Sequence, residues 1–106
     1  MKVAMLATAC VFLTPASVFA AEKPASAAQI KQITTGHDVN IGGATGHYGI
    51  DGSYTYNGQN PGHYKVSKGR ICINFDAGGS RCDRIVVDGA TYTLINKNGD
   101  RYPFGP

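Results

Sequence analysis

The sequence predicts an all-β domain, an antiparallel meander of about eight short strands that closes into a small barrel or curls into a sandwich. Two observations predict this class. The 14 glycines punctuate the chain at short intervals, often directly after Asp or Asn, and such dipeptides favour tight turns. Between the turns lie short runs rich in Tyr, Ile, Val and Thr, which favour strands.

The strand-forming runs follow one another with only short turns between them, an order that favours antiparallel neighbours. No window after Lys31 has the period of a helix, and before it only residues 26–32 have the pattern of a single turn. We expect strands at residues 38–41, 46–50, 53–57, 63–66, 70–75, 82–87, 91–95 and 101–104.

Residues 1–20 have the pattern of an export signal peptide. Lys2 is followed by an apolar run, and the small residues Val18 and Ala20 precede the predicted cleavage site. Lipid attachment at Cys10 is the alternative, but the apolar stretch before it is short. No later stretch is apolar enough to span a bilayer. We therefore expect an exported protein, periplasmic or secreted, without a transmembrane segment.

Cleavage leaves one small domain. Residues 21–34 are rich in Ala, Lys and Gln, and we expect them to form a flexible or weakly helical lead-in to a β domain at residues 35–104. The net charge of +3 is ordinary and gives no argument for nucleic acid. So small a core is marginal, and a covalent staple is expected.

Cys72 and Cys82 are predicted to supply that staple, because paired cysteines in an exported chain form disulfides by default. A metal or redox pair is the alternative, and the absence of Cys-x-x-Cys spacing disfavours it. Pairing the two cysteines in one hairpin fixes its register, with residues 76–78 as the loop. The register places Ile71, Ile73, Phe75, Ile85 and Val87 on one face, and Arg70, Cys72, Asn74, Cys82 and Arg84 on the other.

Six tyrosines and no tryptophan suggest a ligand surface. The candidate ligand-facing residues are Tyr54, Tyr56, Tyr64 and Tyr92, which would line a cavity or a flat sugar-binding face. The alternative places their rings in the core or at the barrel rim with the hydroxyl group in water.

His37, His47 and His63 are the candidate metal ligands. Their spacing matches no known ligand pattern, and the alternative is that they are ordinary histidines on strands. No cofactor is expected.

Signs of catalysis are few. No serine has the Gly-x-Ser-x-Gly context, Glu22 is the only glutamate, and no phosphate-binding loop is present. The sequence therefore predicts a protein that is not an enzyme, with a binding or envelope-associated role and a small ligand or an envelope protein as its partner.

The stretches "TGHDV", "YGIDGSYTY", "GHYKVSKGRICINF" and "RCDRIVVDGATYTLIN" resemble a family of small secreted bacterial proteins of unknown function. The resemblance covers residues 35–104 and is carried by residues 62–66 and 69–72, with Cys82 closing the pattern. The family usually has Trp where Tyr64 stands. The resemblance implies a lipocalin-like or related β fold and an exported location, and it implies no established activity.

The stretch "NGDRY", residues 98–102, is similar to a loop of the periplasmic inhibitors of C-type lysozyme. Those are small exported β-barrels with a disulfide, whose Ser-Gly-x-x-Tyr loop plugs the lysozyme cleft. Gly99 and Tyr102 match that loop, but Asn98 replaces the serine, and the expected disulfide lies within one hairpin. The similarity implies Gly99 and Tyr102 as inhibitor-loop residues.

Overall fold

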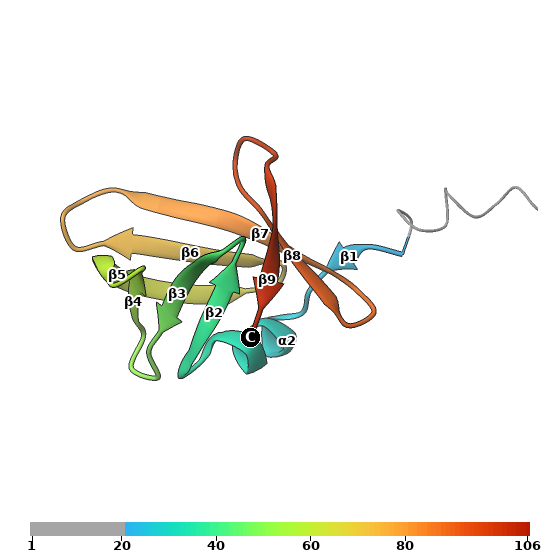
Figure 1. The fold of residues 1–106 in the computed structure, drawn as a ribbon, viewed down its shortest axis with the longest axis horizontal. Helices are drawn as coiled ribbons and strands as arrows, with labels where there is room; N and C mark the ends of the chain where they lie inside the picture. The colour runs from blue at the N-terminus through green and yellow to red at the C-terminus, as the bar shows by residue number, and fades with distance from the viewer. Residues whose placement is uncertain (1–20) are drawn as a thin grey trace, which may run out of the picture.

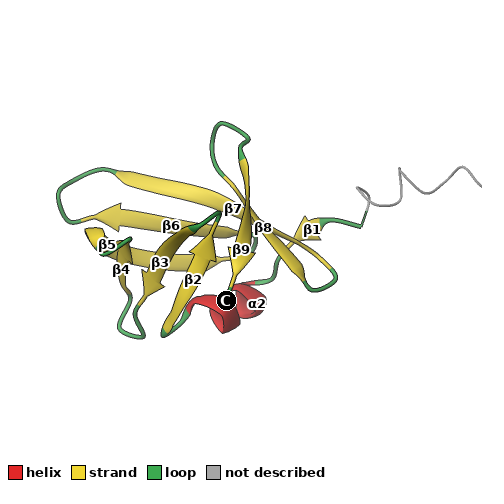
Figure 2. Ribbon diagram, viewed as in Figure 1, coloured by secondary structure: helices red, strands yellow, loops and turns green. Residues whose placement is uncertain are grey.

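The computed structural model describes residues 21–106, which form a closed antiparallel barrel of eight strands with one short helix (Figures 1 and 2). The predicted all-β meander is confirmed, and of the two expected forms the barrel is the one adopted. The barrel strands are β2 (His37–Ile41), β3 (Ala44–Tyr48), β4 (Ser53–Tyr56), β5 (Gln59–Ser67), β6 (Arg70–Phe75), β7 (Ser80–Asp88), β8 (Thr91–Ile95) and β9 (Arg101–Gly105).

Each barrel strand pairs with the next along the chain, and the barrel closes where β9 pairs with β2. This closing contact is short, because only residues 104–105 of β9 pair with residues 40–41 of β2. Because the strands alternate in direction, the turns at residues 42–43, 57–58, 76–79 and 96–100 all lie at one end of the barrel. We call this end the mouth.

Strand β5 begins four residues before its predicted start at residue 63. Pro61 and Gly62 lie in this extension, although neither residue type favours a strand interior. Two features of the barrel allow Pro61 and Gly62 to lie in the strand. The β4–β5 register shifts between Tyr54 and Tyr56, and β5 passes very close to β6 at Gly62. A Cβ atom at Gly62 would overlap the carbonyl oxygen of Asn74, so only glycine fits there.

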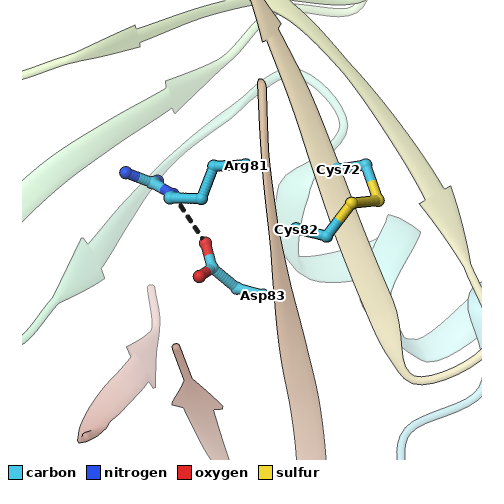
Figure 3. Close-up of a disulfide and its surroundings, with 4 residues drawn as sticks. All are labelled: Cys72, Arg81, Cys82 and Asp83. Atoms are coloured by element: carbon cyan, nitrogen blue, oxygen red, sulfur yellow. Dashed lines mark hydrogen bonds and ion pairs between the residues drawn. A yellow bond between two sulfur atoms is a disulfide. The ribbon is translucent and has the colours of Figure 1, made fainter. Parts of the chain in front are cut away.

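The β6–β7 hairpin has the predicted register. Cys72 lies directly opposite Cys82, and their sulfur atoms form the expected disulfide (Figure 3). The loop closes as predicted, with the Phe75 amide donating to the Gly79 carbonyl oxygen at 3.0 Å. Ile71 and Ile73 point into the barrel and are buried.

Residues 21–34 were expected to form a flexible or weakly helical lead-in. They do contain a helix, but they pack against the barrel as part of the fold. They form β1 (Lys23–Pro24), which pairs with the end of β7, and α2 (Ala27–Thr34). The Ala25 amide donates to the Ile85 carbonyl oxygen, and the Ala25 carbonyl oxygen accepts from Gly69. An ion pair between Glu22 and Arg101 adds a further contact.

The helical turn expected at residues 26–32 is present as helix α2, which extends two residues further, to Thr34. The helix begins with a capping box. The Ser26 hydroxyl accepts from the Gln29 amide, and the Gln29 side chain accepts from the Ser26 amide. Ile30 and Thr34 on its inner face are fully buried. The helix packs against β2 and β5 where β2 begins and β5 ends, so it covers the barrel end opposite the mouth (Figure 1).

The core fills the space between helix and mouth. Tyr48 is at its centre, with its ring 5.1 Å from the rings of both Tyr54 and Tyr64. The aliphatic core side chains come from α2 and from four of the strands: Ile30, Val39, Ile41, Ile71, Ile73, Ile85, Val87 and Leu94.

Candidate functional site

Two charged side chains at the start of β7 point into the barrel. Arg81 and Asp83 lie on one side of the strand, and the disulfide at Cys82 lies on the other (Figure 3). Residues two apart on a strand share a face, so these charges share the face of Ile85, which is fully buried in the core.

The two charges form a close ion pair. Nε of Arg81 donates to Oδ2 of Asp83 at 2.9 Å. The Asp83 side chain is only 3% exposed, whereas that of Arg81 is 39% exposed, so the pair reaches from the core into the mouth.

The second carboxylate oxygen of Asp83 is buried and has no hydrogen-bond partner anywhere in residues 21–106. Leaving a buried polar group without a partner costs about 1–3 kcal/mol, and more for a charged group. This atom therefore requires an explanation that the fold alone does not supply.

Arg81 is held in place by two aromatic residues. Its Nη2 donates to the Tyr54 hydroxyl at 3.3 Å, and the guanidinium carbon lies 5.9 Å from the centre of the Phe75 ring. Burial disfavours the guanidinium charge, but Asp83 and Tyr54 outweigh it, so the pKa of Arg81 is raised above its ordinary value. The pKa of Tyr54 is also raised, because burial disfavours its charged form more than Arg81 favours it. Arg81 therefore carries its charge and Tyr54 its proton at neutral pH.

The ion pair forms part of the lining of a cavity of about 240 Å³ at the mouth. Arg81 and Asp83 are the only charged residues in this lining, which otherwise combines aliphatic, aromatic and amide groups. The cavity is lined by Ile41, Gly42, Tyr56, Arg81, Asp83, Leu94, Asn96 and Tyr102.

A larger hollow of about 400 Å³ lies between the C-terminus and residues 90–92, and none of its lining residues is charged. A third hollow, of about 410 Å³, lies beside the β6–β7 loop and is also lined by uncharged residues. The mouth cavity is the candidate site, because the buried carboxylate of Asp83 is part of its lining.

The four predicted ligand-facing tyrosines do not converge on a common cavity. Tyr54 is buried in the core, and Tyr64 donates its hydroxyl to the Gly49 carbonyl oxygen at 2.9 Å. Tyr92 packs against the core from the other end of the barrel. Tyr56 alone among the four lines the mouth cavity. Most of these rings therefore fill the core, which was the alternative considered for them.

The predicted inhibitor-loop residues both lie at the mouth. Gly99 is exposed at the tip of the β8–β9 turn with a φ of +86°, a conformation that favours glycine. Tyr102 is 37% exposed and forms part of the cavity rim beside Gly42.

The three candidate metal-ligating histidines are not brought together. His47 lies 2.6 Å from Asp38, and His63 lies 3.4 Å from Asp76, in both cases measured between Nδ1 and Oδ1. Both pairs are exposed. Within residues 21–106 no three His, Cys, Asp or Glu side chains gather into a metal-binding group.

Sequence reasoning missed Arg81 and Asp83, although the signal was present. The disulfide register puts every second residue of β7 on the inner face, and Arg81 and Asp83 have the same parity as Ile85. The other face was correctly expected to hold Cys82 and Arg84, but the charges on the apolar face were passed over.

No family model matches the chain, and neither a curated protein nor a solved structure matches it. The two resemblances noted in the sequence thus stay predictions. In the part of the chain that the structure describes, no helix is long and apolar enough to cross a membrane. The predicted signal peptide and Cys10 lie outside the described residues.

Proposed function

We propose that this chain is an exported, non-catalytic binding protein that takes up a small polar ligand at the mouth of its barrel. The observation that carries the proposal is the Asp83 carboxylate, which lines the cavity and has one buried oxygen without a partner in the described fold. A ligand that donates a hydrogen bond to this oxygen offsets the cost of burying it.

The ion pair is hard to explain as a stabilising device. Replacing a buried ion pair by apolar residues of similar volume is often neutral or stabilising, so such pairs are weak evidence for a role in stability. Apolar side chains occupy the neighbouring inward positions at Ile71, Ile73 and Ile85. A role in ligand recognition accounts for a charged pair at the two positions nearest the mouth.

The chemistry of the cavity supports binding rather than bond cleavage. Its single carboxylate is tied to Arg81, and acid–base catalysis usually needs two titratable groups with separated pKa values. The predicted signal peptide and the disulfide support the exported location.

The test is a screen of small polar compounds against the full chain by amide NMR. We expect hits that shift the signals of Tyr56, Asp83 and Leu94. Asp83→Asn should lower the affinity for those compounds about tenfold or more, because it exchanges a charged acceptor for a neutral amide. Asp76→Asn is the matched control, because it makes the same change on the outside of the mouth, where Asp76 faces His63.

Hits that shift signals elsewhere, or that bind Asp83→Asn as tightly as the unchanged protein, contradict the proposal. The folded state of each variant is checked by its near-ultraviolet circular dichroism before the titrations are compared.

A second candidate is inhibition of C-type lysozyme, favoured by the exposure of Gly99 and Tyr102 on one hairpin at the mouth. An equimolar mixture should then slow lysis of a bacterial cell-wall suspension, and Tyr102→Ala should restore it. Unchanged lysis in the presence of excess protein rejects this candidate and leaves small-ligand binding untouched.

A further inference from the structure

We propose that the ligand of the mouth cavity is a small zwitterion of the α-amino acid class with an apolar side chain. Its ammonium group donates to Oδ1 of Asp83, and its carboxylate accepts from the guanidinium group of Arg81. This inference rests on the proposed function and names the ligand class for the same site.

The charge of the site is the first argument. The cavity presents one positive and one negative side chain, held 2.9 Å apart, and no other charged residue lines it. A simple cation attracted to Asp83 is repelled by Arg81, and a simple anion attracted to Arg81 is repelled by Asp83. A ligand that carries both charges gains from both groups.

The hydrogen-bonding groups left over are the second argument. Oδ1 of Asp83 is enclosed and lacks a donor within residues 21–106, so it would accept from a ligand's ammonium group once the neighbouring side chains of the cavity move apart. Arg81 uses Nε for Asp83 and Nη2 for Tyr54, and its Nη1 makes no hydrogen bond to the described residues. A guanidinium group has five N–H donors in a planar fork that suits a carboxylate. Nη1 of Arg81 and Oδ1 of Asp83 therefore match the carboxylate and the ammonium group of an amino acid.

The rest of the cavity suits an aliphatic or aromatic side chain. Ile41 and Leu94 are buried aliphatic residues in its lining, and the rings of Tyr56 and Tyr102 lie at its rim. Burying an apolar group against these side chains removes it from water.

The size of the cavity limits the ligand. Its volume of about 240 Å³ is below the ~300–1,000 Å³ of pockets that hold drug-sized molecules. A single amino acid is therefore favoured over a longer peptide.

The experiment titrates the full chain with L-leucine and with three analogues: N-acetyl-L-leucine, L-leucinamide and isoamylamine. N-acetylation removes the ammonium group, and the other two compounds lack the carboxylate. We expect L-leucine to bind with shifts at Asp83 and Leu94, and each analogue to bind about 10- to 100-fold more weakly, as expected when a charged hydrogen bond is lost.

The variants separate the two ends of the ligand. Asp83→Asn should lower the affinity for L-leucine about tenfold or more. It should change the affinity for N-acetyl-L-leucine little, because that analogue has no ammonium group to contact Asp83. Asp76→Asn should bind L-leucine as the unchanged protein does. Should Asp83→Asn fail to fold, the double variant Arg81→Met/Asp83→Leu replaces it, and L-leucine binding should be lost.

Three outcomes overturn the inference. If isoamylamine or N-acetyl-L-leucine binds as tightly as L-leucine, the ligand is not a zwitterion. If the cavity takes up neutral compounds in the NMR screen but not L-leucine, the class is wrong and the binding function stands. If no compound shifts the cavity signals, the inference and the proposed function fail together.

Discussion

Asp83 carries a negative charge into a barrel wall otherwise made largely of isoleucine, valine and tyrosine. Its position is fixed by the alternation of β7, and its partner is the next inward residue toward the mouth, Arg81. The pair makes the inner face amphipathic along one strand: apolar near α2 and charged near the solvent. The two residues on which the proposed binding site rests are thus the two that depart from the apolar pattern.

The first prediction separates the contribution of this pair to stability from its contribution to binding. Arg81→Leu should lower the free energy of unfolding by about 2–3 kcal/mol, because it leaves Asp83 buried without a counter-charge. The double variant Arg81→Leu/Asp83→Leu should recover most or all of that loss, since no buried charge remains. Urea unfolding measures both values. A double variant less stable than Arg81→Leu would mean that the pair is needed for folding.

Individual residues were predicted unevenly from the sequence. Cys72 and Cys82 were identified because their spacing and the alternation around them agree on one register. Tyr54 and Tyr64 could not be assigned to core or cavity, because a tyrosine suits either environment until the neighbouring rings are known. Arg81 and Asp83 were passed over because charges are expected to face water, and only the tertiary arrangement shows that they meet.

At the scale of elements, the β6–β7 hairpin is the best specified part of the molecule. The disulfide closes a short loop between directly opposed residues on the outer face. It lies next to the strand position that carries Asp83, so it helps to hold that side chain at a fixed place in the wall.

Removing the disulfide should therefore destabilise the protein without changing its fold. We expect Cys72→Ala/Cys82→Ala to lower the free energy of unfolding by about 2 kcal/mol, the amount that closing a short loop supplies through the entropy of the unfolded chain. Urea unfolding of the variant and of the reduced protein should agree. A loss of the β-sheet signal in circular dichroism at low urea would show that the staple is needed for the fold itself.

The packing of helix α2 on the barrel depends on the burial of Ile30. Ile30→Ala should cost about 2–4 kcal/mol, because it opens a cavity beneath the helix where the side chain is fully buried. Lys31→Ala on the exposed side of the same helix is the control and should change stability by less than about 0.5 kcal/mol. Equal effects of the two substitutions would argue against the packing of α2 on the barrel.

Elements were predicted from sequence to the extent that local chemistry determines them. The strands β6 and β8 have their predicted bounds, since Gly-containing turns flank them on both sides. The N-terminal segment was not predicted to be part of the fold. An eight-residue helix has little intrinsic stability, and this one depends on burying Ile30 and Thr34 against strands far away in the sequence.

At the scale of the whole molecule, closure depends on a pairing between the first and last barrel strands. This contact between β2 and β9 joins segments more than sixty positions apart, and no local pattern announces it. The sequence therefore predicted a meander and could not decide between barrel and sandwich. Once closed, the barrel has one end covered by α2 and the other lined by Arg81 and Asp83.

The closed barrel also buries Tyr48 and Tyr54, and their burial predicts how the stability of the protein changes at alkaline pH. Burial raises the pKa of Tyr48 well above its ordinary value and raises that of Tyr54 as well. In the unfolded chain both titrate near pH ~10. The folded state therefore retains two protons that the unfolded state loses, and stability should fall as the pH rises above about 10.

Tyrosinate absorbance and circular dichroism measure this in one titration. Tyr48 and Tyr54 should ionise only together with unfolding, because burial raises the pKa of both. The variant Tyr48→Phe should show a smaller loss of stability between neutral and alkaline pH. Ionisation of all tyrosines in one step while the fold remains intact would contradict the burial described above.

Because one end of the barrel is covered by α2 and the other is open, substitutions at the two ends should affect the fold differently. Hairpin tips at 42–43, 57–58, 76–79 and 96–100 surround the mouth, while the packing that keeps the chain folded lies below them. Libraries that vary tip positions such as Ala77 and Lys97 should change the surface of the mouth with little cost in foldability. They should leave unchanged the tip residues that have a positive φ, namely Gly42, Gly43, Asn57, Gly58, Gly78, Gly79 and Gly99.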